Sequence, residues 1–233
     1  MQNNHILLIN IPFTFVETKL CPLEQVSIET LKLISMLKDD NEVSFINMRS
    51  KGSFTWKSRS AGIKSDKVLQ MSIAAKSQQY LINNIRQLEK KPNLILIICN
   101  FSFAPYTFDM DAIKSIISIC EQVLPNVSMN ICGSFIDLFP DIANELKNDL
   151  KLDKLEIDNS KLDKYKPDLY SLGKEKYGLF QLVRGCVNSC SFCVAAKSKL
   201  SKFDIDETIL YMQELYEKYH INNFWNWDQN VFS

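Results

Sequence analysis

Three cysteines lie within eight residues toward the carboxyl-terminal end of the chain: Cys186, Cys190 and Cys193, in the sequence Cys-Val-Asn-Ser-Cys-Ser-Phe-Cys. Three thiolates brought together by one short loop make a soft, anionic site that suits zinc or an iron–sulfur cluster. A structural zinc site normally has four protein ligands, and the two histidines, His5 and His220, are both distant in the sequence. Three ligands leave one metal position open, which indicates a bound exogenous molecule.

The other cysteines of the chain are scattered singly. The total of seven is an odd number, and nothing in the sequence indicates a disulfide framework. Free cysteine packs as a small hydrophobe, so we expect these four side chains to be buried and structural. They are Cys21, Cys99, Cys120 and Cys132.

Strand and helix patterns alternate along the first two thirds of the chain. This rhythm predicts a parallel sheet covered by helices on both faces, with ligands at the carboxyl ends of the strands. There is no GxGxxG after the first strand and no GxxxxGK[ST], so dinucleotide and P-loop sites are not supported. Strands are expected over 5–11, 43–48, 94–99 and 127–132, with a weaker one over 155–157. Helices are expected over 22–37, 67–88 and 140–147, and a further helix is expected to begin after a cap at Asp109 or Asp111. Residues 50–64 are expected to form a loop.

The remainder of the chain predicts a second module. Residues 159–176 are rich in Lys, Asp and Ser and predict a connector. A strand predicted over 177–183 runs directly into the cysteine motif, and a last strand is predicted over 224–227. Between them a helix is predicted to start at Asp204 to Glu207, and its residues Ile209, Met212, Tyr216 and Tyr219 share one face. The expected domains are therefore an α/β domain over 1–158, a linker over 159–176 and the start of another domain over 177–233.

The cysteine motif and its context resemble a known superfamily. The sequence Arg184-Gly185-Cys186-x-x-x-Cys190-x-Phe192-Cys193, directly after a strand, is similar to the cluster loop of radical S-adenosylmethionine (radical SAM) enzymes. The resemblance implies that the three cysteines bind a four-iron, four-sulfur (4Fe–4S) cluster and that S-adenosylmethionine chelates the fourth iron. It further implies that S-adenosylmethionine is cleaved reductively to a 5′-deoxyadenosyl radical, and that Phe192 lies beside its adenine.

The resemblance extends to the order of the modules. A Rossmann-like parallel α/β domain, a connector and then the start of a βα (partial TIM) barrel is the order found in radical SAM proteins with a cobalamin-binding domain. Residues 227–232 resemble the second barrel strand of those proteins, which would place Asp228 near the cluster mouth. The DxHxxG signature of cobalamin ligation is absent, and Gly133-Ser134 stands where Gly-Gly is common, which both weigh against bound cobalamin.

The segment that resembles the barrel is short. It has 57 residues from Tyr177 to Ser233, whereas a complete eight-unit barrel takes about 250. We therefore expect an amino-terminal portion of a larger enzyme, or a subunit whose barrel is completed by a partner chain. Three hypotheses stay open: a radical SAM enzyme whose substrate is not identified, a non-catalytic truncated or split subunit that binds the cluster, and a zinc-binding α/β module.

Composition restricts the partners. Lys+Arg and Asp+Glu are both 27, and this zero net charge argues against a broad nucleic-acid surface. No apolar run approaches the roughly 20 residues that span a bilayer, and the first residues do not resemble a signal peptide, so we expect a cytoplasmic protein. The resemblance implies a small flavodoxin- or ferredoxin-type protein as the electron donor. Lys197, Lys199 and Lys202 make a basic stretch that is either a solvated face or a docking surface for such an acidic donor.

Overall fold

The amino-terminal part of the chain forms a parallel sheet. A computed structural model describes residues 4–11, 26–48, 75–99, 110–152, 157–172, 177–188, 190–191, 200–226 and 228. The sheet has the order β2-β1-β3-β4, and all three strand pairs are parallel. The predicted α/β architecture with a parallel sheet is therefore confirmed. The strands are β1 (Asn4–Asn10), β2 (Asn41–Asn47), β3 (Leu94–Ile98) and β4 (Ser128–Cys132).

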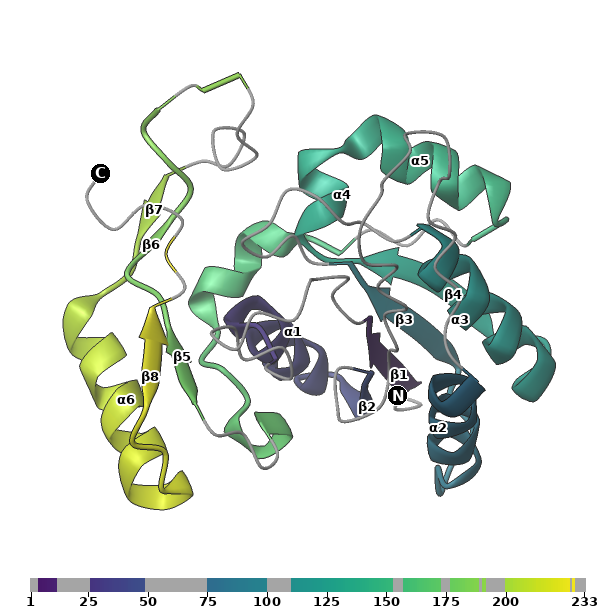
Figure 1. Ribbon diagram of the computed structural model, residues 1–233, viewed down its shortest axis with the longest axis horizontal. Coiled ribbons are helices and arrows are strands. Elements are labelled where there is room, and N and C mark those ends of the chain that lie inside the picture. The colour runs from purple at the N-terminus through teal and green to yellow at the C-terminus, as the bar shows by residue number, and fades with distance from the viewer. Residues whose placement is uncertain are drawn as a thin grey trace, which may run out of the picture.

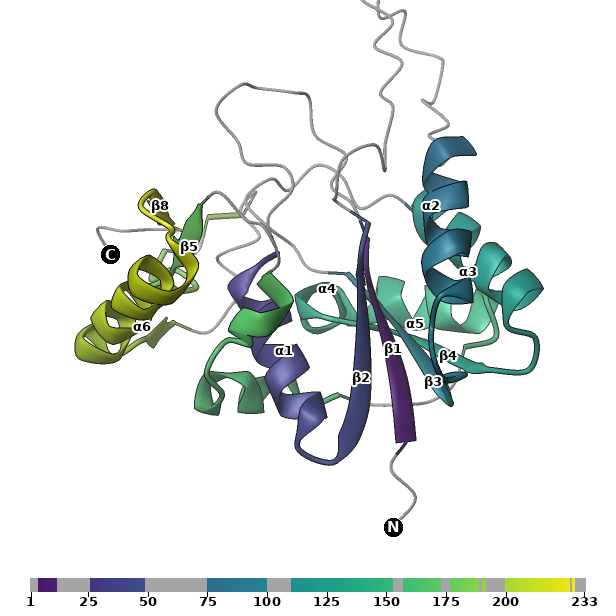
Figure 2. The ribbon, with the colours of Figure 1, turned by 90° about the horizontal axis from the view of Figure 1, so that it is seen from below.

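Helices cover both faces of this sheet, as the alternating pattern predicts (Figure 2). One face packs against α1 (Ile28–Lys38), and the other packs against α2 (Ala75–Arg86), α3 (Met110–Val123) and α5 (Pro140–Asp149). Strand β1 divides its side chains between the two cores, because successive residues of a strand point to opposite faces. Leu7 and Ile9 lie in the α2/α3/α5 core, and Ile6 and Leu8 lie in the α1 core.

Helix α1 begins later than the sequence predicts. The expected start was near residue 22, but the helix starts at Ile28 because Ser27 caps it: the Ser27 hydroxyl accepts a hydrogen bond from the Thr30 amide at 3.2 Å. Asp111 lies inside α3 and is not its cap, and Asp109 lies outside the described residues. A short helix, α4 (Ser134–Leu138), was not predicted.

Several predictions fall wholly or partly outside the described residues. These include the loop over 50–64, the first eight residues of the helix predicted over 67–88, and residues 155–156 of the weak strand predicted over 155–157. Ile157, the last residue predicted for that strand, is not in a strand. In the described part of the chain, the parallel sheet of the amino-terminal module has four strands.

The predicted connector packs closely against α1. It contains two 3₁₀ helices, η1 (Asn159–Lys164) and η2 (Leu169–Leu172), and both Leu162 and Leu169 are buried. The Asp168 amide donates to the Leu31 carbonyl at 3.1 Å, and the Ser35 hydroxyl donates to the Lys166 carbonyl at 2.7 Å. These contacts fix the position from which the chain enters the second module, which lies beside α1 (Figure 1).

The second module is built from a β–α–β unit. Strands β5 (Gly178–Phe180) and β8 (Phe224–Asn226) are parallel neighbours, and α6 (Ile205–Tyr219) connects them. The predicted start of α6 is confirmed, because the Asp204 carboxylate accepts the Glu207 amide at 2.9 Å as an N-cap. Among the described helices, none is long and apolar enough to span a bilayer.

Two predictions for this module are wrong. The strand over 177–183 is interrupted at Gln181-Leu182, and a separate strand, β6 (Val183–Arg184), pairs with β7 (Ser201–Lys202) in antiparallel register. The face of α6 expected to pack is also largely in solvent, since Ile209 and Tyr216 are 47% and 61% exposed. Leu215 is the buried residue of this helix, and it packs with Leu31 of α1.

Candidate functional site

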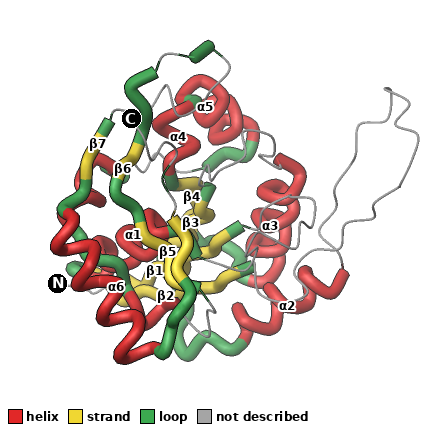
Figure 3. Tube along the Cα trace, turned by 60° about the vertical axis from the view of Figure 1, so that its left-hand side comes forward, coloured by secondary structure: helices red, strands yellow, loops and turns green. Residues whose placement is uncertain are grey.

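The chain segment that carries the cysteine motif is held closed at its base. It leaves β6 at Arg184 and returns at Ser201 of β7, and these two residues are directly paired. Figure 3 shows the two short strands side by side. The Phe203 amide extends this ladder by donating to the Leu182 carbonyl at 2.9 Å. The two ends of the segment that contains the motif are therefore held at a fixed separation and direction.

The structure describes two of the three cysteines. Cys186 follows β6 at once and is half-buried, whereas Cys190 is exposed. Cys193 and Phe192 lie outside the described residues. Among the described residues no group of three or more His, Cys, Asp or Glu side chains is close enough together to hold a metal ion.

The backbone around Cys186 is turned toward its sulfur. Gly185 has φ of 79°, a left-handed conformation that L side chains rarely adopt and that allows the chain to turn directly after β6. The Asn188 amide then donates to the Cys186 sulfur, with a nitrogen–sulfur distance of 3.4 Å. An amide that points at a thiol sulfur stabilises negative charge there, so this geometry favours the thiolate that a metal requires.

Asp228 braces the base of this loop. It is 4% exposed, and its Oδ1 accepts hydrogen bonds from the Leu182 and Val183 amides at 2.7 and 2.8 Å. Its own amide donates to the Asn226 side chain at 2.8 Å. The sequence predicts Asp228 near the cluster mouth as a cofactor-binding residue; its hydrogen bonds in the structure go to the backbone three and four residues before Cys186.

A second contact fastens the loop to the connector. The Arg184 guanidinium lies 2.7 Å from the Asp163 carboxylate, and both side chains are partly buried. Asp163 was not predicted, because it is 21 residues away from Arg184 and nothing in its local pattern marks it. Asp228 and Asp163 together hold the three residues 182–184, which precede the cysteine motif.

The scattered cysteines are chemically different from those of the loop. Cys99, Cys120 and Cys132 are buried, as predicted, and Cys21 lies outside the described residues. Burial raises the pKa of the Cys99 thiol well above its usual value and raises the pKa of the Cys120 and Cys132 thiols to about 12. These thiols therefore stay protonated at neutral pH, as buried structural cysteines do.

The histidines are not placed for ligation either. His5 is in β1 and is buried, and its Nε2 lies 2.8 Å from the Ser44 hydroxyl. His220 is exposed and ends α6 in a left-handed conformation with φ of 56°. From the sequence we expected surface or strand-end positions: His220 is at the surface, whereas His5 is buried near the start of β1.

The sheet also has an edge where ligands commonly bind. Because β1 lies between β2 and β3, the crossover direction reverses between β1 and β3, and ligands of open parallel sheets bind at the carboxyl ends of such strands. Residues 12–25 and 100–109, which follow these two strands, lie outside the described residues. After β4 the chain turns at Gly133, where φ is 105°, and enters α4 at Ser134.

Comparison with known proteins adds no assignment to this geometry. No protein-family model, curated protein sequence or solved structure matches the chain.

Proposed function

We propose that this chain is part of a radical SAM enzyme and that Cys186, Cys190 and Cys193 hold a 4Fe–4S cluster to which S-adenosylmethionine binds. One observation carries the proposal: the CxxxCxxC spacing lies between the two parallel strands of a β–α–β unit, where Cys186 is six residues after the end of β5 and directly follows the short strand β6. A βα barrel is built from such units, and its catalytic groups lie at the carboxyl ends of the strands. On this proposal the parallel sheet is the Rossmann-like domain that precedes the barrel.

The donor set of the loop fits an iron–sulfur cluster. Three thiols at this spacing supply soft anionic ligands and leave one iron for an exogenous ligand, and the Asn188 amide directed at Cys186 is the type of contact that tunes cluster sulfurs. When bound, such a cluster supplies the electron for cleavage of the sulfonium carbon–sulfur bond. Phe192 is then the proposed neighbour of the adenine.

The residues around the loop have a positioning task in this proposal. Asp228 and Arg184 fix the backbone on the amino-terminal side of Cys186, and the β6–β7 pair fixes where the loop returns. A site that must leave one ligand position open depends on rigid support of the others, since a mobile loop would let a fourth protein or solvent ligand approach. Lys202, which is exposed on β7, belongs to the proposed docking surface for a small acidic electron donor.

Anaerobic reconstitution of the full 233-residue chain tests this function. We expect about four irons and four acid-labile sulfides per chain, and a reduced-cluster electron paramagnetic resonance signal that changes when S-adenosylmethionine is added. Replacing any one of Cys186, Cys190 and Cys193 by Ala should abolish that signal. Cys132→Ala is the matched control, because it removes a buried thiol outside the loop and should leave the iron content unchanged.

The outcomes separate the remaining hypotheses. A cluster signal that does not respond to S-adenosylmethionine would favour a cluster-binding subunit that needs a partner chain to complete the barrel. Zinc without acid-labile sulfide would contradict the radical SAM assignment and establish a zinc-binding α/β module. Cobalamin is tested in the same preparation by its visible absorption, and a bound corrin would place a second cofactor at the carboxyl edge of the sheet.

A further inference from the structure

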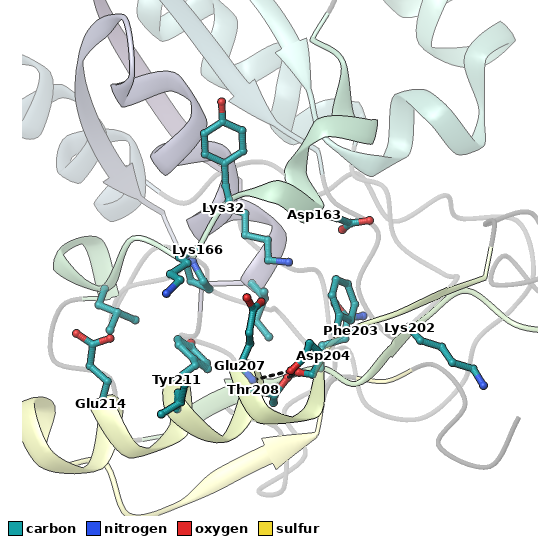
Figure 4. Close-up of a pocket in the computed structure, with 16 residues that line it drawn as sticks. Lys32, Asp163, Lys166, Lys202, Phe203, Asp204, Glu207, Thr208, Tyr211 and Glu214 are labelled. Carbon is teal, nitrogen blue, oxygen red and sulfur yellow. Dashed lines mark hydrogen bonds between the residues drawn. The ribbon is translucent and has the colours of Figure 1, made fainter.

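A cavity lies where the two modules meet, and neither Cys186 nor Cys190 lines it. It has a volume of about 280 Å³ and is bounded by α1, the connector, the end of β5, β7 and α6. Figure 4 shows side chains from α1 and α6 directed into it from opposite sides. Small-molecule sites of proteins begin at roughly 300 Å³, so this cavity suits a compact ligand.

Lys32 of α1 brings an ammonium group into this cavity without a matching anion. The residue is only 9% exposed, and its Nζ lies 4.3 Å from the centroid of the Phe203 ring. Among the described residues it has no hydrogen bond and no ion pair. The carboxylate that raises its pKa most, that of Asp163, is bound to Arg184 at 2.7 Å. A buried ammonium with unused donors is costly unless an acceptor reaches it.

The electrostatic surroundings of Lys32 agree with this description. Burial lowers the pKa of its ammonium group, and the opposing effect of Asp163 and Glu29 does not fully compensate. Glu207 also raises the pKa of Lys32, whereas Arg184 lowers it. Lys32 therefore lacks a counter-ion strong enough to offset its desolvation.

Gln181 adds a second unused polar group to the same wall. It follows β5, is 6% exposed as a whole residue and lines the cavity. Among the described residues its side-chain amide makes no hydrogen bond, so the amide is open to a ligand in the cavity. The amide can donate to the same kind of acceptor that Lys32 needs.

The opposite side of the cavity is acidic. Glu207 lies in the first turn of α6 and is exposed, and its carboxylate points toward the Lys32 ammonium across the cavity in Figure 4. The two groups do not form an ion pair, so each keeps a free charge facing the space between them. Ile28 and Leu169 supply buried aliphatic surface beside these charges.

We propose that this cavity binds a small α-amino acid with an aliphatic side chain. Its carboxylate accepts hydrogen bonds from Lys32 and Gln181, its ammonium group pairs with Glu207, and its side chain packs against Ile28 and Leu169. A zwitterion satisfies both free charges at once. A simple carboxylate would leave Glu207 unpaired, and a simple amine would leave Lys32 unpaired. This binding is independent of the proposed cluster.

Three probes of the same shape test the proposal by calorimetry on the full chain: L-leucine, 4-methylpentanoate, which lacks the ammonium group, and 3-methylbutylamine, which lacks the carboxylate. L-leucine should bind, and each analogue should bind at least tenfold more weakly, a difference of about 1.4 kcal/mol. Lys32→Met and Glu207→Gln should each weaken leucine binding by at least tenfold. The controls Lys164→Met in η1 and Glu217→Gln in α6 remove exposed charges that do not line the cavity and should leave leucine binding unchanged.

Other results would overturn the proposal. Equal binding of 4-methylpentanoate and leucine would show a plain carboxylate site with no role for Glu207. Absence of binding by all three probes would show that Lys32 and Glu207 serve the packing of the modules only. If Lys32→Met does not fold, the test is made on the unaltered protein: leucine should shift the nuclear magnetic resonance signals of the Gln181 side-chain amide, and unchanged signals would contradict the proposal.

Discussion

At the scale of single residues, the base of the cysteine loop depends on one carboxylate. Asp228 is buried, and its Oδ1 accepts two backbone amides that have no other partner in the regular structure around them. Its Oδ2 is also buried and has no partner within the described residues. A carboxylate in this position replaces the strand hydrogen bonds that β5 loses where it breaks before β6. Asp228 is therefore a positioning residue for the loop that carries Cys186.

Asp228→Ala should destabilise the protein and loosen the loop. Leaving a buried donor unsatisfied costs about 1–3 kcal/mol, so we expect the free energy of unfolding to fall by about 2 kcal/mol. Hydrogen exchange of the Leu182 and Val183 amides should accelerate, and the reconstituted chain should retain less iron. Asp228→Asn keeps an acceptor oxygen and should lie between the alanine variant and the unaltered protein. Unchanged exchange at both amides in Asp228→Ala would rule out the bracing role.

At the scale of elements, the strands of the first module were predictable and several boundaries were not. Runs such as Leu94 to Ile98 are apolar on both faces, and only a central parallel strand needs that pattern. The start of α1 was missed because the helix begins only after the Ser27 cap, which lies inside the predicted helical pattern. The break in the strand before Arg184 was missed because its cause, Asp228, lies 45 residues further on.

The candidate site was predictable to a similar extent. The spacing of the three cysteines is local and visible in the sequence, and so is the strand before them. The supports of the loop come from Asp163 and Asp228, which reach it only through the fold. Lys32 was likewise invisible as a cavity residue, because a lysine within an amphipathic helix is normally a solvated side chain. Contacts between distant elements are not encoded in local pattern.

The packing of the β–α–β unit depends on a glycine. A Cβ atom on Gly178 would lie 2.8 Å from two carbons of the Phe224 ring and 2.9 Å from Cδ1 of Leu215. These distances are shorter than the contact distance of non-bonded carbon atoms. Phe224 belongs to β8, the strand paired with β5. Gly178→Ala should therefore separate β5 from β8 and α6 and lower the free energy of unfolding by about 1–3 kcal/mol, as overpacked cores do.

Urea denaturation measures this effect. Glu217→Ala is the control, because it introduces alanine at an exposed position of α6 and should change the free energy of unfolding by less than about 0.5 kcal/mol. A Gly178→Ala protein as stable as the unaltered one would mean that Leu215 and Phe224 can move aside without cost. The packing of β5, β8 and α6 would then be looser than the contacts around Gly178 indicate.

At the scale of the whole molecule, α1 joins the two modules. Its Leu33 and Ile34 belong to the core of the sheet, whereas its Leu31 packs with Leu215 of α6. The connector strengthens this arrangement, because Lys38 of α1 forms an ion pair with Asp168 at 2.7 Å. A helix that contributes to two cores couples them, so the described elements should unfold in one cooperative transition.

Leu215→Ala tests this coupling. Removing a fully buried leucine side chain costs about 2–5 kcal/mol, and the cost should appear in both modules. Native-state hydrogen exchange should show that the opening free energies of the Ile97 amide in β3 and the Leu179 amide in β5 fall together. Leu210→Ala, on the same helix but 63% exposed, should leave both nearly unchanged. If only the Leu179 amide is affected, the two modules unfold separately, and the α1–α6 contact is an interface between independent domains. If the opening free energies of both amides fall, the position of the cysteine loop depends on the integrity of the parallel sheet, because the connector and α1 join the module of the loop to that sheet.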